Sequence, residues 1–156
     1  MQDLFHTAPL ASSEAHLAFA LVQMFDPTVT LRDWLAFARR WGRRRRDQGG
    51  LMAVRDRRGI LHALYSYTVE RNIRHDPCLR ISDLIVARLP GADLDSAILF
   101  GIQELAEQLG CETLRIDVPV PASNTCAAAC LSGLVGPSFS PFAVTFLQHV
   151  PGRMRC

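Results

Sequence analysis

"ISDLIVARLPGADLDSAILFGIQELAEQLGCETLRIDV", residues 81 to 118, is the stretch that decides the fold of this chain. An apolar run ends at Arg88, a Pro-Gly turn follows, and apolar side chains then recur at helical spacing until Gly110. Beyond that glycine, TLRIDVPV is typical of a strand. Two strands joined through a helix are expected to lie parallel in one sheet. The stretch therefore predicts a strand, a helix over residues 94 to 109 and a second, parallel strand.

Two further strands are predicted before this unit. LMAVRD and LHALYSYTVE flank the turn DRRG, and NIRHDP forms a loop that leads to the strand CLRISDLIVARL. The second of these strands alternates, which places on one face Leu61, Ala63, Tyr65, Tyr67 and Val69. Because hairpin strands are antiparallel and the helix-linked pair is parallel, the predicted sheet is mixed.

Helices are predicted on both sides of these strands in the sequence. The helical N-terminal part covers residues 12 to 46, with one helix over residues 12 to 25 and a second that Thr30 caps. Residues 123 to 133 suggest a short helix, and FAVTFLQHV a last strand. We therefore expect one domain over residues 1 to 156, of the α+β class, or α/β with a mixed sheet, with helices flanking the sheet.

The composition narrows the class of protein. Hydrophobic residues make up 49% and charged residues 21%, as in an ordinary globular protein. A net charge of +2 does not by itself favour nucleic acid or an acidic membrane as a partner, and no apolar run reaches the length of a membrane span. The five cysteines form no CxxC pair, which favours reduced thiols and a cytoplasmic protein. No histidine has metal-ligand spacing, so no metal site is expected.

From Leu51 to about Val118 the chain resembles the GNAT superfamily of acyl-CoA-dependent N-acyltransferases. The features that carry the resemblance are LMAVRDRRGILHALYSYTVE, ISDLIVARL with its loop and helix, and AEQLGCETLRIDV. The resemblance implies a protein that transfers an acetyl or longer acyl group from acyl-CoA to an amine. It also implies that the two parallel strands splay apart to admit the pantetheine arm of the acyl donor.

The same resemblance assigns residues to binding of acetyl-CoA or another acyl-CoA. They are Ile85, Val86, Ala87, Arg88, Gly91, Ala92, Asp93, Leu94 and, from the later helix, Asn124. Loop amides and the helix N-terminus would hold the pyrophosphate. RLPGAD, however, puts Asp93 where the family has a small residue, and a carboxylate there repels phosphate. The alternative is an ordinary helix that Asp93 caps with its side chain, while Asp95 complements the helix dipole.

Catalytic residues are less clearly marked. In the family a tyrosine often protonates the leaving thiolate, but the matching position here is Leu131, and Tyr65 and Tyr67 lie in an earlier strand. Our candidate base is Asp83, which we expect on the buried face of its strand, where a carboxylate holds its proton more tightly. The alternative is a strand bulge that turns Asp83 toward solvent. Glu70, at the end of the neighbouring strand, is the second candidate.

The run RRWGRRRRD ends the second N-terminal helix and leaves several interpretations open. Cations are favoured at a helix C-terminus, so Arg43 to Arg46 fit a solvated helix end, but they also fit contact with a phosphate or an acidic partner. Two functions other than acyl transfer therefore remain open. One is a non-catalytic GNAT-like module that senses acyl-CoA or binds a protein; the other is an interaction protein for anionic polymers. The sequence names neither the acceptor nor the acyl chain length, and it leaves a homodimer open.

Overall fold

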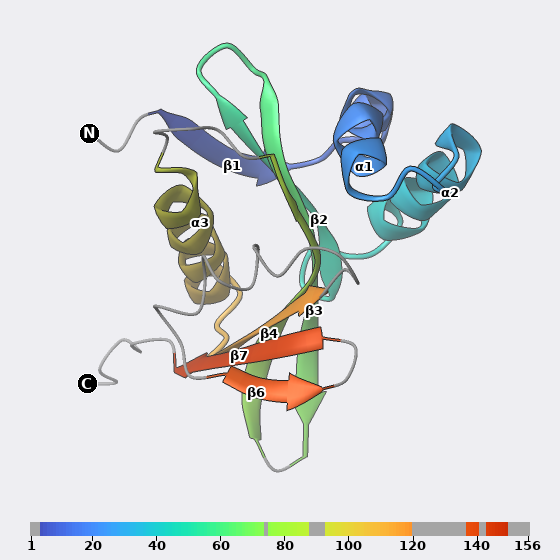
Figure 1. Ribbon diagram of the computed structural model, residues 1–156. Helices are drawn as coiled ribbons and strands as arrows, with labels where there is room; N and C mark the ends of the chain where they lie inside the picture. Colours follow the sequence, from blue (N-terminus) through green and yellow to red (C-terminus); the bar gives the residue numbers. More distant parts are fainter. Residues whose placement is uncertain (1–3, 74, 88–92, 120–136, 141–142, 150–156) are drawn as a thin grey trace.

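The computed structural model describes residues 4–73, 75–87, 93–119, 137–140 and 143–149, and these form one mixed sheet with helices on both faces (Figure 1). The strands are β1 (Phe5–Pro9), β2 (Gly49–Asp56), β3 (Leu61–Asn72), β4 (His75–Val86), β5 (Thr113–Pro119), β6 (Pro137–Ser140) and β7 (Ala143–His149). Their order across the sheet is β1-β2-β3-β4-β5-β7-β6. β4 and β5 pair in parallel and the other neighbours are antiparallel, so the predicted mixed sheet is confirmed.

The helices are η1 (Ser12–Ala18), α1 (Phe19–Phe25), α2 (Leu31–Gly42) and α3 (Leu94–Gln108). Thr30 caps α2 as predicted, because its Oγ1 accepts from the Asp33 N–H at 3.2 Å. The single helix predicted over residues 12 to 25 was wrong in its first half, where η1 is a 3-10 helix. The Ala15 carbonyl in this segment accepts a hydrogen bond from the Trp34 indole of α2 at 2.6 Å.

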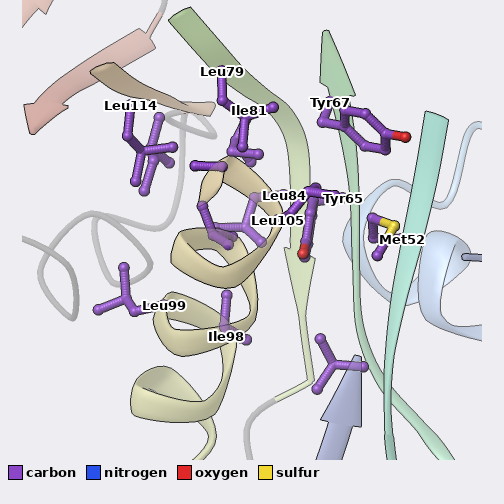
Figure 2. Close-up of a cluster of buried hydrophobic side chains, with 14 of the residues drawn as sticks. Met52, Tyr65, Tyr67, Leu79, Ile81, Leu84, Ile98, Leu99, Leu105 and Leu114 are labelled. Atoms are coloured by element: carbon purple, nitrogen blue, oxygen red, sulfur yellow. The ribbon is translucent and has the colours of Figure 1, made fainter. Parts of the chain in front are cut away.

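Apolar side chains cover both faces of the sheet. On one face, β2 to β5 pack against α3, and Figure 2 shows this cluster between the helix and the strands. On the other face, η1, α1 and α2 pack over Leu51, Ala53, Leu64 and Ile85. We call the first the α3 face and the second the α1–α2 face of the sheet.

The pattern predicted for β3 is confirmed with one exception. Ala63, Tyr65, Tyr67 and Val69 belong to the cluster on the α3 face, but Leu61 packs against the cluster on the α1–α2 face. The reason is a register shift between β2 and β3 next to Val54, which reverses the alternation there. The loop predicted at NIRHDP was also wrong, because β3 runs to Asn72 and β4 begins at His75.

Helix α3 approaches edge strand β1 at Gly101. A Cβ built on Gly101 would meet the Thr7 Oγ1 and would lie 3.0 Å from the Thr7 Cβ. Such separations are too short for ordinary packing, so this glycine lets α3 and β1 come together.

We predict that Gly101→Ala destabilises the protein by about 1 kcal/mol, although alanine is the better helix former. The cause is overlap with Thr7. Urea unfolding of Gly101→Ala and of the double variant Thr7→Ala/Gly101→Ala checks this, since the second change removes the Oγ1 and should restore part of the loss. A Gly101→Ala variant that is more stable than the wild type would contradict the close approach.

Candidate functional site

Strands β4 and β5 stop pairing well before either strand ends. Their parallel register runs from Cys78 opposite Thr113 to Ile81 opposite Ile116, whereas β4 continues to Val86 and β5 to Pro119. β4 stays paired with β3 through Val86, and β5 stays paired with β7. We call the parts of the two strands that do not pair with each other, residues 82–86 of β4 and 117–119 of β5, the β4–β5 fork. Its position agrees with the splaying that the sequence resemblance implied.

A bulge in β4 marks the start of the fork. Ser66 of β3 pairs with Ser82, and Leu64 pairs with Ile85, so β4 contains one extra residue between the pairs. Among the described residues, Asp83 is the one non-glycine residue with positive φ, at 52°. This backbone conformation costs about 1 to 2 kcal/mol for an L-residue, although aspartate adopts it more readily than most. The strain is therefore placed where the two strands separate.

The bulge decides where Asp83 points. The prediction that it lies buried on the face of Leu79 and Ile81 was wrong: Asp83 is exposed, and its Oδ2 accepts from the Ser66 hydroxyl at 2.7 Å. Ser66 is two residues from Leu64 in β3, so both side chains lie on the same face of the sheet. Leu64 packs on the α1–α2 face, and the Asp83 carboxylate that binds Ser66 therefore lies on that face too. The alternative interpretation, a bulge that turns Asp83 toward solvent, is confirmed.

The backbone amides after the bulge differ in what they bind. The Ala87 N–H donates to the His62 carbonyl of β3 at 2.8 Å and so has a partner. Because antiparallel hydrogen bonding alternates, the Ile85 N–H also points toward β3, and the Val86 N–H points away from β3 into the fork. Val86 thus provides an amide at an edge of β4 that has no partner among the described strands.

Charged side chains cross the strands at the base of the fork. Arg80 donates from Nε to Asp117 at 2.6 Å and from Nη1 to Glu70 at 3.1 Å, and Arg115 donates from Nε to Asp117 at 3.1 Å. Asp117 is 8% exposed, so the two guanidiniums compensate a nearly buried carboxylate. Two hydrogen bonds raise the pKa of Arg80: the bond to Asp117 has the larger effect and the bond to Glu70 the smaller one. The register places Asp117 on the α1–α2 face with Asp83.

The structure does not bring the two predicted bases together. Glu70 pairs opposite Cys78, and it lies four residues along β3 from Ser66, or about 13 Å. Its carboxylate is held by Arg80. Asp117 was missed by the sequence reasoning, although one signal was present. Arg115 and Asp117 alternate with Leu114 and Ile116 in a strand predicted to be parallel to its neighbour, and parallel strands are usually covered on both faces.

The start of α3 does not have the predicted cap. Asp93 is at the N-cap position, but its side chain makes no capping hydrogen bond, so that interpretation was wrong. Asp95 does lie in the first turn. Leu94, assigned to cofactor binding, is 4% exposed and packs in the cluster on the α3 face. The α3 N-terminus therefore keeps N–H groups without a side-chain acceptor from its own N-cap residue.

Other predicted residues lie outside the part of the chain that the structure describes. These are Arg88, Gly91, Ala92, Asn124 and Leu131.

Both tyrosines lie in the described part of the chain. Tyr67 donates to the Arg46 carbonyl at 2.9 Å, and Tyr65 is fully buried on the α3 face. Burial raises the pKa of Tyr65, and its hydroxyl has no hydrogen-bond partner among the described residues.

The arginine run has the geometry of a solvated helix end. Arg43 to Arg46 are exposed, with the Arg44 guanidinium 4.2 Å from the centre of the Trp41 ring and Arg46 donating to Gln108 at 3.0 Å. Within the described ranges, no three His, Cys, Asp or Glu side chains are grouped as metal ligands. No helix in those ranges has the length and apolar character needed to cross a membrane.

Comparison with known proteins identifies the fold. No protein-family model matches the sequence, and no curated protein matches it. Among solved structures, FdhC, described as a nucleotide-linked sugar GNAT, is similar with a TM-score of 0.69, 9% identity and coverage of 94% of this chain and 87% of that one. Spermidine N-acetyltransferase SpeG from Vibrio cholerae is similar with a TM-score of 0.65, 12% identity and coverage of 94% of both chains.

Glucosamine-6-phosphate N-acetyltransferase from Arabidopsis thaliana is also similar, with a TM-score of 0.59, 18% identity and coverage of 88% of this chain and 96% of that one. At these identities the likeness concerns the fold. The chain has the GNAT fold, as its sequence indicated.

We predict that Asp117→Asn lowers the free energy of unfolding by about 1 to 3 kcal/mol, because two arginines lose the charge of a nearly buried partner. The matched control is Asp47→Asn, which removes an exposed carboxylate paired with Arg45 at 3.1 Å. The control should change stability by less than about 1 kcal/mol. Urea unfolding measures both, and equal small effects would show that the Asp117 cluster does not support the fold.

Proposed function

We propose that this protein is an acyl-CoA-dependent N-acyltransferase that transfers an acetyl or longer acyl group to an amine. The observation that carries the proposal is the β4–β5 fork, where a strained bulge places an accessible carboxylate beside a strand edge that pairs with no other described strand. The GNAT fold supports it, since solved structures with this fold include N-acetyltransferases of different substrates.

In the proposed reaction the amine nitrogen attacks the thioester carbonyl, a C–N bond forms, and the C–S bond breaks. The donor leaves as a thiolate, which takes up the proton that the amine has given to the base, directly or through water. The Val86 N–H is the proposed donor to the developing oxyanion. Asp83 is the proposed base, which accepts the amine proton directly or through water. The Ser66 hydroxyl, 2.7 Å from the Asp83 Oδ2, holds this carboxylate in place.

The described residues fit the acyl donor only in part. The α3 N-terminus offers backbone N–H groups and the positive end of a helix dipole to a diphosphate. Asp93, however, is exposed at this end and adds a negative charge. We therefore propose that the chain binds acyl-CoA weakly, and that Asp93 is the residue that limits the affinity.

The acceptor is proposed to approach from the α1–α2 face. Asp83 and Asp117 both lie on that face, one from each strand of the fork. Arg80 and Arg115 compensate Asp117, whereas Asp83 carries its charge in solvent. A protonated amine is attracted to such a carboxylate before it gives up its proton. A small amine or the amine of a larger molecule fits this chemistry.

We predict that Asp93→Gly tightens binding of acetyl-CoA about three- to tenfold, because a negative charge near the diphosphate is removed. Isothermal titration with acetyl-CoA measures the affinity. Glu107→Gln, at the other end of α3, is the control for the loss of one carboxylate. Unchanged or weaker binding by Asp93→Gly, with loss of stability, would show that Asp93 acts on the helix and not on the ligand.

We predict that Asp83→Asn lowers kcat about a hundredfold for any amine that the protein acylates. Mass spectrometry of the products from a panel of amines with acetyl-CoA gives the rates, and Asp47→Asn is the control. Because the chain contains no lysine, an acyl-lysine in the assay belongs to a protein substrate. Wild-type activity in Asp83→Asn would remove Asp83 from the mechanism. Binding of acetyl-CoA without turnover of any amine would favour the sensing module.

A further inference from the structure

A groove runs along the contact between edge strand β1 and helix α3, away from the β4–β5 fork. Its volume is about 440 Å³. Leu4 and the first half of β1, as far as Thr7, line one side. The other side is lined by Asp93 and by one face of α3 that runs through Phe100 to Glu104. Leu4 is 58% and Phe100 59% exposed, so two large apolar side chains face solvent at this groove. Surfaces of this kind mark sites of interaction.

The charge of the groove is negative. Asp93 and Glu104 are both exposed, and the described residues that line the groove include His6 but neither arginine nor lysine. The two carboxylates lie eleven positions apart on α3, or about 16 Å along the helix axis. Asp93 makes no capping hydrogen bond, so its charge is available to a ligand. The lining therefore favours a positively charged partner that also carries apolar groups.

The backbone of β1 adds a second means of recognition. β1 is the first strand in the sheet order, so β2 is its one partner among the described strands. The Leu10 N–H donates to the Leu51 carbonyl of β2, and the regular register carries this alternation along β1. The N–H groups of Thr7 and Phe5 consequently point toward the free edge of the sheet. The backbone nitrogen of Pro9 also faces this edge, but proline has no N–H to donate.

We propose that β1 and α3 together bind an extended, positively charged peptide segment of a partner protein, which adds a strand to the free edge of β1. Main-chain hydrogen bonds to Thr7 and Phe5 give the direction, apolar side chains cover Leu4 and Phe100, and basic side chains face Asp93 and Glu104. A segment that spans 16 Å is about five residues long in the extended form. This site shares Asp93 with the proposed acyl-donor site but lies away from the β4–β5 fork, so variants at Thr7 and Glu104 test it independently of acyl transfer.

Labelled octapeptides that alternate Lys or Arg with Val, Leu or Phe test the proposal by fluorescence anisotropy, with Glu-containing octapeptides of the same apolar pattern as the matched set. We expect members of the basic set to bind and members of the acidic set not to bind. Glu104→Gln should weaken binding about two- to fivefold, the range of one exposed charge pair. Glu107→Gln, on the same helix but outside the groove lining, should leave binding unchanged.

Thr7→Pro separates strand addition from simple attraction of cations. It removes an N–H that points to the free edge, which edge strands tolerate, so the protein should fold and peptide binding should fall at least tenfold. Unaltered peptide binding by Thr7→Pro, or no binding by any basic peptide, would overturn the proposal. Binding of spermine but not of peptides would replace it with a small-cation site. A wild-type dimer that Thr7→Pro converts to monomer would assign the edge to a second copy of this chain.

Discussion

The pairing of β4 is the constraint on which the rest of this structure depends. β4 pairs with β3 over almost its whole length but with β5 over only four residues. Because a main-chain amide in a sheet interior needs a partner, strands that part inside a sheet leave amides that must be met by water or a ligand. The bulge at Asp83 makes the parting possible, since one extra residue bends β4 and reverses its alternation. Separation of the strands, the strained backbone and the exposed carboxylate thus have one common cause.

The separation is held in place from both faces of the sheet. Leu79 and Ile81 of β4 and Leu114 and Ile116 of β5 are buried against α3 up to the last parallel pair. On the opposite face, Arg80 connects β4 to Asp117 of β5, which is the first residue past that pair. A charge-assisted hydrogen bond at 2.6 Å across the point of divergence fixes the distance between the strands there. Apolar packing and an ion pair therefore define together where the fork begins.

Charge is distributed unevenly over the molecule. A group of exposed arginines lies at the end of α2, whereas Asp83 lies at the fork and Asp93 and Glu104 line the β1–α3 groove. The chain has 17 arginines and no lysine. A guanidinium stays protonated and is a poor nucleophile, whereas a lysine amine can lose its proton and react with a thioester. A chain proposed to bind acyl thioesters thus carries its positive charge in a form that the thioester does not readily acylate.

The sequence by itself determined the order of elements around the strand–helix–strand unit, the mixed sheet and the cap at Thr30. These depend on local periodicity, turn residues and caps, which the residues of one segment encode. It did not determine the face on which Asp83 lies, the length of the β3–β4 hairpin or the role of Asp117. Asp83 alternates correctly for a buried position until one extra residue enters β4, and the sequence left that bulge as one of two alternatives until the register with β3 decided between them. Asp117 depends on arginines from two strands, and only the tertiary structure brings those side chains within hydrogen-bonding distance.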